Sequence, residues 1–260
     1  MLDTTIVSKP YFRQQIYGSL GFASHGGKVR CEPESMAWIA PSLLAADFTR
    51  LAEALEIVKA AGASTVHVDV MDGHFTPDIT VGQPVIASLR KATDLVLDVH
   101  LLIERPERYV ADFVKAGADW LSVQAEATVH LHRVLDLIRR HGAKAGVALN
   151  PATSLAVLDE ALADLDFVTI LAADPALKDQ RFLPGSVAKV RAAGRTRTER
   201  GLNFALQVEG GLEEGNLAEV VYAGADILVV GSAIFTHKEP GKHLAEMVRS
   251  AAEAGGIGRA

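Results

Sequence analysis

The sequence predicts a (β/α)₈ barrel, and three observations favour this fold class. Eight short apolar runs alternate with longer amphipathic stretches between residues 38 and 250. The amphipathic stretches close with glycine, as in KAAG and RRHG, which is typical of helix ends. Eight such units in about 220 residues fit a barrel, whose usual size is roughly 250 residues. An open doubly wound sheet is the alternative, but PSLLAADF follows the first run without the G-x-G-x-x-G of a dinucleotide site.

Each expected strand is a short apolar run bounded by turn residues or by the end of a helical pattern. The expected strands are residues 38–41, 65–70, 95–101, 119–124, 144–149, 167–171, 204–208 and 226–231. The segments between them place apolar residues at helical spacing, as in FTRLAEALEIVKAAG, RYVADFVKAG, HLHRVLDLIRRHG and LAEVVYAG. We interpret these segments as the crossover helices of one barrel domain.

The two ends of the chain differ from this pattern. Residues 1–37 include SLGFASHGGKVRCEPES, which is rich in Gly, Ser and charge and has no sustained period. We expect residues 1–37 to form an irregular N-terminal extension, 38–250 the barrel, and 251–260 a C-terminal tail.

Composition excludes several classes of protein. The 260 residues are 49% hydrophobic and carry a formal charge of −6, which does not favour a nucleic-acid partner. The single cysteine, Cys31, cannot form an intrachain disulfide, and no apolar run is long enough to cross a bilayer. We therefore expect a cytoplasmic protein with no nucleic-acid or membrane partner; a homo-oligomer is possible.

Polar side chains with the same alternation occur in the second and third expected strands. In Val66-His67-Val68-Asp69-Val70 the valines share one face, and His67 and Asp69 share the other. The third strand repeats this arrangement with Asp98 and His100. If the apolar face meets the helices, the imidazoles and carboxylates point into the barrel, where an isolated charge is costly unless it is paired or bound to metal.

The seventh expected strand brings a further acid, Glu209, to the same rim. Two histidines and two carboxylates are suitable ligands for Zn²⁺, Mn²⁺, Fe²⁺ or Co²⁺, and two opposed carboxylates could also move protons. A packing role for any one of these residues is the common alternative, but three strands with the same pattern favour a functional site.

Successive motifs resemble the ribulose-phosphate 3-epimerase family from about residue 38 to 236. They are IAPSLLAADF, HVDVMDGHFTPDITVGQPV, LDVHLLIERPERYV, HGAKAGVALNPAT and AGADILVVGSAIF, in the order in which the family has them. The resemblance implies a metal-dependent (β/α)₈ barrel that inverts C3 of a ketose phosphate such as ribulose 5-phosphate or xylulose 5-phosphate.

The resemblance also implies roles for individual residues. It places one divalent ion (Zn²⁺, Fe²⁺, Mn²⁺ or Co²⁺) on His67, Asp69, His100 and Glu209. Asp69 would remove the proton beside the carbonyl, and Glu209 would return one from the opposite face to a cis-enediolate. The residues that it places at the substrate are Ser42, Met71, Asp72, Gly73, Gly210, Gly211, Gly231 and Ser232.

Three departures from the family pattern fall on the same rim. Glu209 stands where the family has aspartate, and Gln124 where it commonly has histidine. The family's glycine loop N-P-G-F-G-G-Q is here residues 174–180, DPALKDQ, so three glycines that allow close backbone approach to a phosphate are absent. Lys178 could compensate as a point charge. We interpret this clustering as a change in substrate preference within the family.

Two other functions remain as alternatives beside an ordinary epimerase. A degenerate barrel that binds or senses a sugar phosphate without turnover would also explain Glu209 and the altered loop. A decarboxylase of the orotidine phosphate type would need D-x-K-x-x-D after its strand, and Asp69-Val70-Met71-Asp72 contains no lysine.

Overall fold

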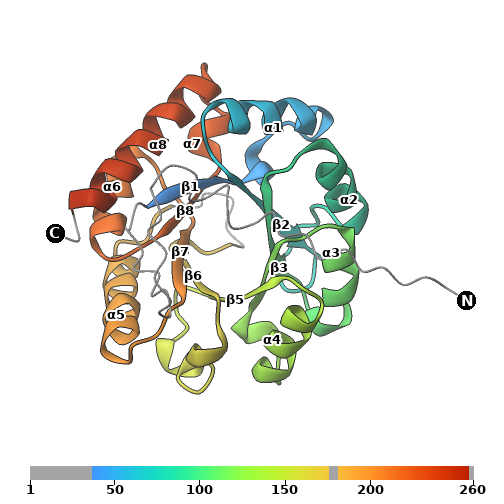
Figure 1. Cartoon of the computed structure of the whole chain (residues 1–260), viewed down its shortest axis with the longest axis vertical. Coiled ribbons are helices and arrows are strands. Elements are labelled where there is room, and N and C mark those ends of the chain that lie inside the picture. The colour runs from blue at the N-terminus through green and yellow to red at the C-terminus, as the bar shows by residue number, and fades with distance from the viewer. Residues whose placement is uncertain (1–36, 176–180, 258–260) are drawn as a thin grey trace, which may run out of the picture. The chain divides into compact units, whose positions relative to one another are not determined.

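The protein is a barrel of eight parallel strands surrounded by helices, as a computed structural model of residues 37–175 and 181–257 shows (Figure 1). The strands are hydrogen-bonded in the order β1-β8-β7-β6-β5-β4-β3-β2. A parallel bridge between Ser42 and His67 joins the two outer members of this order. The predicted fold class is confirmed.

The strands lie within one or two residues of their predicted bounds. They are β1 Trp38–Pro41, β2 Thr65–Met71, β3 Val96–Leu102, β4 Trp120–Gln124, β5 Lys144–Leu149, β6 Phe167–Leu171, β7 Ala205–Glu209 and β8 Ile227–Val230. Apolar runs of this length are buried on both faces of a parallel sheet, which explains why they stand out in the sequence.

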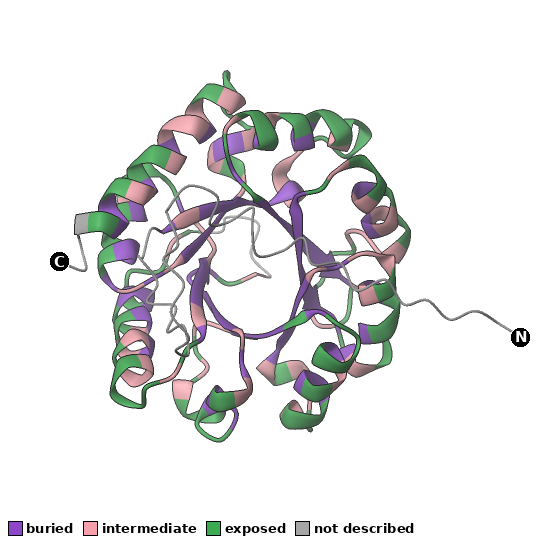
Figure 2. Cartoon of the chain, in the orientation of Figure 1, coloured by how far each residue is buried: buried purple, intermediate pink, exposed green. Residues whose placement is uncertain are grey.

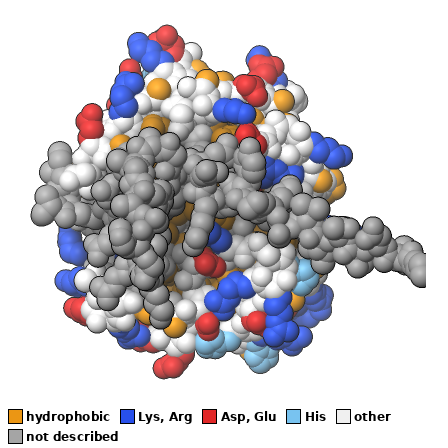
Figure 3. Space-filling model, in the orientation of Figure 1, with side chains coloured by type: hydrophobic (Ala, Val, Ile, Leu, Met, Phe, Trp, Pro, Cys, Tyr) orange, Lys and Arg blue, Asp and Glu red, His pale blue; other side chains and the backbone are white. Residues whose placement is uncertain are grey.

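The helices follow the strands and cover the outside of the barrel. They are α1 Leu51–Ala60, α2 Gln83–Ala92, α3 Val110–Ala116, α4 Leu131–Arg140, α5 Gly185–Glu199, α6 Glu214–Tyr222, α7 Ser232–Phe235 and α8 Pro240–Ile257. None of the helices in the described part of the chain is long and apolar enough to cross a membrane. Charged side chains of both signs lie around the edge of the face drawn in Figure 3.

Two details differ from the sequence prediction. The segment between β5 and β6 contains two short 3₁₀ helices, Leu155–Leu158 and Leu162–Asp164, in place of an α-helix. Ser154 caps the first of them by accepting a hydrogen bond from the backbone N–H of Ala156. At the other end, α8 continues to Ile257, seven residues beyond the boundary predicted at residue 250, and Ala251 and Ala254 of this extension are buried.

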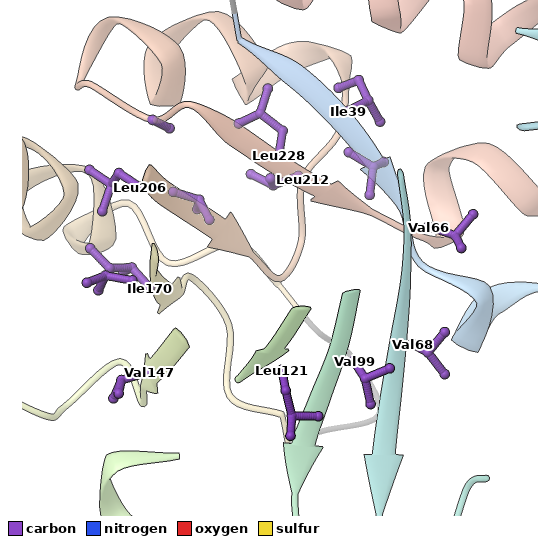
Figure 4. Close-up of a cluster of buried hydrophobic side chains, with 14 of the residues drawn as sticks. Ile39, Val66, Val68, Val99, Leu121, Val147, Ile170, Leu206, Leu212 and Leu228 are labelled. Carbon is purple, nitrogen blue, oxygen red and sulfur yellow. The ribbon is translucent and has the colours of Figure 1, made fainter. Parts of the chain in front are cut away.

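The apolar face of each strand meets the helices, as the alternation predicted. Val66 and Val68 of β2 and Val99 of β3 are buried outside the barrel, in one cluster with apolar helix residues (Figure 4). Burial is concentrated on the strands and on the helix faces turned toward them, while the outer helix faces are exposed (Figure 2). His67, Asp69, Asp98 and His100 therefore project into the barrel interior.

The interior has an apolar half at the amino ends of the strands. Here Trp120 lies 6.5 Å from Trp38 and 5.5 Å from Phe167, measured between ring centroids. Val96 and Ile227 belong to the same cluster. Gly146 of β5 leaves room for the Phe167 ring, because a Cβ atom there would come within 2.3 Å of it. The aromatic rings thus close one end of the barrel, and polar residues occupy the other.

Candidate active site

A cavity of about 200 Å³ opens at the carboxyl ends of the strands. This is the end at which (β/α)₈ enzymes place their catalytic groups. Ser42, Asp69, Met71 and Glu209 line the cavity, as do Gly210, Gly211, Gly231 and Ser232. The cavity therefore collects residues that lie at the ends of β2 and β7 or follow β1, β7 and β8.

His67, Asp69, His100 and Glu209 form a compact cluster, of which Asp69 and Glu209 line this cavity. Parallel pairing of β2 with β3 sets Asp69 opposite His100. His67 Nε2 lies 3.2 Å from Asp69 Oδ1 and 3.4 Å from Glu209 Oε2. His100 Nδ1 lies 3.1 Å from Glu209 Oε2 and 3.5 Å from Asp69 Oδ1. The extra methylene of Glu209 brings its carboxylate to both imidazoles.

Charges within the cluster shift the pKa values of its members. Burial disfavours the imidazolium form of His67, but the nearby charges of Asp69, Asp98 and Glu209 outweigh it and raise its pKa well above the ordinary value. In His100, burial is likewise outweighed by Glu209 and Asp69, and the pKa rises to about 9. Burial alone would raise the pKa of Asp69, yet His67 and His100 hold it well below its usual range.

Asp98 binds the ring nitrogen of His67 that does not face the cluster. His67 Nδ1 donates to Asp98 Oδ2 over 2.8 Å, and Gln207 Nε2 donates to the same oxygen over 2.6 Å. Thr169 Oγ1 in turn donates to Gln207 Oε1. An aspartate that accepts from Nδ1 fixes the hydrogen there and leaves the lone pair of Nε2 facing the cluster.

Ser42 holds the other oxygen of Asp69. Its hydroxyl donates to Asp69 Oδ2 over 2.8 Å, so Oδ2 is occupied while Oδ1 faces the two histidines. Ser42 is 6% exposed and lies at the cavity wall. A carboxylate held at both oxygens is fixed in orientation.

The donor set of this cluster fits a divalent metal ion. One ligand atom from each of His67, Asp69, His100 and Glu209 lies within 4.8 Å of all the others. Two imidazole nitrogens and two carboxylate oxygens suit ions such as Zn²⁺, Mn²⁺, Fe²⁺ and Co²⁺. Their excess of negative charge, increased by Asp98, also favours a cation at this position.

Comparisons with known proteins agree with this geometry. A model of the ribulose-phosphate 3-epimerase family matches residues 38–235. The chain belongs to that family. It is 43% identical to the ribulose-phosphate 3-epimerase of Bacillus subtilis (strain 168) over 82% of this chain and 98% of that protein. It is 47% identical to that of Synechocystis sp. over 76% of this chain and 86% of that protein. Membership places the chain among the epimerases that act on carbohydrates.

The similarity to more distant solved structures supports the fold alone. The tryptophan synthase alpha subunit of Legionella pneumophila superimposes with a TM-score of 0.55 at 16% identity, covering 84% of this chain and 92% of that one. At this identity the likeness shows a shared barrel and carries nothing about chemistry.

The residues expected at the substrate of this epimerase fold fall into three groups. Six of them line the cavity: Ser42, Met71, Gly210, Gly211, Gly231 and Ser232. Asp72 and Gly73 do not line it. Asp72 instead accepts hydrogen bonds from the backbone N–H groups of His74, Phe75 and Glu104, so it joins the loops after β2 and β3. Lys178 and residues 176–180 lie outside the described part of the chain.

Gly210 has a structural reason for being glycine. Its φ is +105°, and a Cβ atom would lie 2.7 Å from the backbone nitrogen of Ala173. Gly211 also has a positive φ, +64°. The turn after β7 therefore needs glycine for its own conformation, and the same turn exposes backbone at the cavity wall.

Two residues near the cluster had no role assigned from the sequence. Asp98 was expected to point inward, but its contact with His67 depends on the register of β2 against β3, which places the two residues opposite each other. Gln124 was noted as a departure from the family pattern, and its side chain contacts His100. Register and side-chain rotamer decide both contacts, and neither can be deduced from strand alternation.

Proposed function

We propose that the protein catalyses metal-dependent epimerisation at C3 of a ketose phosphate, either ribulose 5-phosphate with xylulose 5-phosphate or a related ketose phosphate. The observation that carries this proposal is the pair of carboxylates, Asp69 and Glu209, that flank two histidines at one cavity. Inversion at a carbon beside a carbonyl needs one base and one acid on opposite faces of that carbon.

Asp69 is the proposed base. Its Oδ2 is held by Ser42 and its Oδ1 lies beside the histidines, so its orientation is preset toward the cavity. The low pKa that His67 and His100 impose keeps the carboxylate ionised at neutral pH. Asp69 takes the proton from C3, and the electron pair left on carbon moves into the carbonyl to give an enediolate.

Glu209 is the proposed acid. It comes from β7, three strands away around the barrel from β2, which carries Asp69, and both side chains line the cavity. Glu209 gives a proton to the opposite face of C3, the enediolate returns to the ketone, and the configuration is inverted. For the next turnover in the same direction, the proton must pass from Asp69 back to Glu209 through the solvent.

The ion on His67, Asp69, His100 and Glu209 would be Zn²⁺, Fe²⁺, Mn²⁺ or Co²⁺. When bound, it supplies a Lewis acid that stabilises negative charge on the substrate oxygens. Metal analysis of wild type against His67→Ala and His100→Ala tests this ligand set. We expect stoichiometric metal in the wild type and a loss in both variants; equal and negligible metal in all three proteins would contradict it.

The substrate phosphate is proposed to lie at the backbone of Gly210, Gly211, Gly231 and Ser232. Backbone N–H groups at such turns are suitable anion ligands, and barrels often hold phosphate after their last two strands. Lys178 is proposed to supply a positive charge there.

A substrate panel in D₂O tests the reaction itself. Ketopentose and ketohexose phosphates and their unphosphorylated forms are incubated with metal-loaded protein, and deuterium at C3 is followed by NMR. We expect exchange and epimer formation with at least one ketose phosphate and little with its unphosphorylated form. Binding of a sugar phosphate without deuterium uptake would favour the alternative, a sugar-phosphate sensor.

A further inference from the structure

Gln124 is a buried polar residue beside the cluster that the proposed reaction leaves without a role. It ends β4 and has no exposed surface. Its Nε2 lies 3.0 Å from Nε2 of His100. Its Oε1 is buried too and has no hydrogen-bond partner among the described residues. Leaving a buried amide oxygen without a partner is costly, so a hydrogen-bond donor is expected to face it in the working protein.

The orientation of the His100 ring identifies that donor. Nδ1 faces the cluster, 3.1 Å from Glu209 Oε2 and 3.5 Å from Asp69 Oδ1, so Nδ1 is the nitrogen available to a metal ion. An imidazole that binds metal through Nδ1 carries its hydrogen on Nε2. That hydrogen needs an acceptor, and the amide NH₂ group of Gln124 cannot accept it.

Rotation of the amide supplies the acceptor. A half-turn about the Cγ–Cδ bond exchanges Oε1 and Nε2 while the carbon atoms stay in place. Oε1 then occupies the position 3.0 Å from His100 Nε2. The exchange gives Oε1 a partner and moves the NH₂ group to the position that has none among the described residues, so the hydrogen on His100 Nε2 decides between the two orientations.

We propose that Gln124 is a positioning residue for the metal centre, whose Oε1 accepts the hydrogen on Nε2 of His100 and so leaves Nδ1 free to bind the ion. The inference rests on the metal site of the proposed function. It gives the two histidine ligands parallel supports: Asp98 holds the hydrogen of His67, and Gln124 holds the hydrogen of His100. A neutral amide is the weaker acceptor of the two, so His100 is the less firmly oriented ligand.

The test compares Co²⁺ affinity, measured by competition with a chelator, in four proteins. Gln124→Met keeps the length of the side chain and removes the acceptor; we expect Co²⁺ to bind about 10- to 100-fold more weakly. Gln124→Glu keeps an acceptor, and we expect affinity at or above that of the wild type. Ser122→Ala is the matched control, because Ser122 lies two residues earlier on the same inward face and its buried hydroxyl has no partner among the described residues. It should bind Co²⁺ as the wild type does.

Long-range ¹H–¹⁵N correlation spectra of the Zn²⁺-loaded wild type give a second measurement, which is read on the wild type itself and requires no substitution of Gln124. The His100 signals are assigned by their absence in His100→Ala. We expect hydrogen on Nε2 and metal on Nδ1. Hydrogen on Nδ1 in the loaded protein would overturn the proposal.

The outcomes separate this inference from the proposed function. Unchanged Co²⁺ affinity in Gln124→Met, or a loss in Gln124→Glu as large as in Gln124→Met, overturns the role of Gln124 alone. A wild type that does not bind Co²⁺ overturns the metal site and this inference with it. Glu214, His243 and Glu246 form another group of possible ligands on α6 and α8, so the titration is repeated with His243→Ala to assign each binding event.

Discussion

The two halves of the barrel interior are built on the same strands but from opposite kinds of residue. At the amino ends, Trp120 packs between Trp38 and Phe167, and these aromatic rings fill the space. At the carboxyl ends of the strands, His67, Asp69, His100 and Glu209 occupy the equivalent inward positions. Burial of apolar area stabilises the first half, whereas the second half concentrates charges that are costly to bury.

The difference indicates how a parallel barrel divides stability from chemistry. In the apolar half, each side chain contributes through contacts that depend on volume and shape. In the polar half, each side chain depends on a specific partner, as Asp69 does on Ser42 and His67 on Asp98. Substitutions in the polar half should therefore change metal affinity and activity, and those in the apolar half should change stability.

The largest expected effect follows from Asp69→Asn. An amide cannot accept the proton from C3 at neutral pH, so we expect deuterium exchange to fall by at least about 10²–10⁴-fold, the usual contribution of a general base. The thermal unfolding midpoint should change little, because the side chain keeps its shape and Ser42 can still donate to it. Deuterium uptake and a thermal melt on the same preparation check this. Exchange at the wild-type rate would assign the base to another residue.

Phe167→Ala tests the apolar half of the barrel interior. Phe167 is 1% exposed and packs on Trp120 and over Gly146, so its truncation leaves a cavity in the apolar end of the barrel. We expect the free energy of unfolding to fall by about 3–5 kcal/mol. Chemical denaturation measures it. Co²⁺ affinity at temperatures where the variant is folded should match the wild type; a parallel loss of affinity would show that the two halves are coupled.

The sequence correctly predicts which side chains of β2 and β3 point into the barrel, and the reason is physical. A strand side chain alternates with a period of two, so the valines of β2 and β3 mark the helix-facing side and leave His67, Asp69, Asp98 and His100 inside. Contacts between strands need the register as well, which is why the pairing of Asp98 with His67 was not predicted. The segment from β5 to β6 shows the same limit, because 3₁₀ turns and a helix can share one apolar pattern.

The polar half should also respond to pH in the metal-free protein. The pKa values of His67 and His100 are raised, that of His100 to about 9, so their contribution to stability is complete below about pH 6.5, the ordinary histidine pKa. The contribution of His100 is lost as pH rises toward 9. We expect the unfolding free energy of metal-free protein to fall by on the order of a few kcal/mol over this range.

Co²⁺ affinity should rise over the same pH range, because the ion competes with these protons. Denaturation of metal-free protein and chelator competition between pH 6 and 9 check the two trends. Phe167→Ala is the control, since it should show the same pH slope from a lower starting stability. A flat wild-type profile in both measurements would contradict the electrostatic account of the cluster.

Glu209→Asp tests the length of one side chain in the polar half, and its effect should be the smallest. The structure places Glu209 Oε2 within 3.1 Å of His100 Nδ1 and 3.4 Å of His67 Nε2, so the longer side chain already reaches both imidazoles. Shortening it withdraws the carboxylate by roughly one carbon–carbon bond, about 1.5 Å. We expect Co²⁺ affinity and activity on the preferred ketose phosphate to fall by about tenfold, with little gain on ribulose 5-phosphate, because misplacement of a reacting group by 1 Å can cost up to about 100-fold.

The opposite result of Glu209→Asp would identify an ordinary epimerase. If Glu209 is only a drifted aspartate, the shorter side chain should restore the geometry of an ordinary epimerase, and activity on ribulose 5-phosphate should rise sharply. Steady-state kinetics of both proteins on ribulose 5-phosphate and on the best substrate of the panel distinguish the two cases, since only adaptation to another substrate predicts a loss on one without a gain on the other.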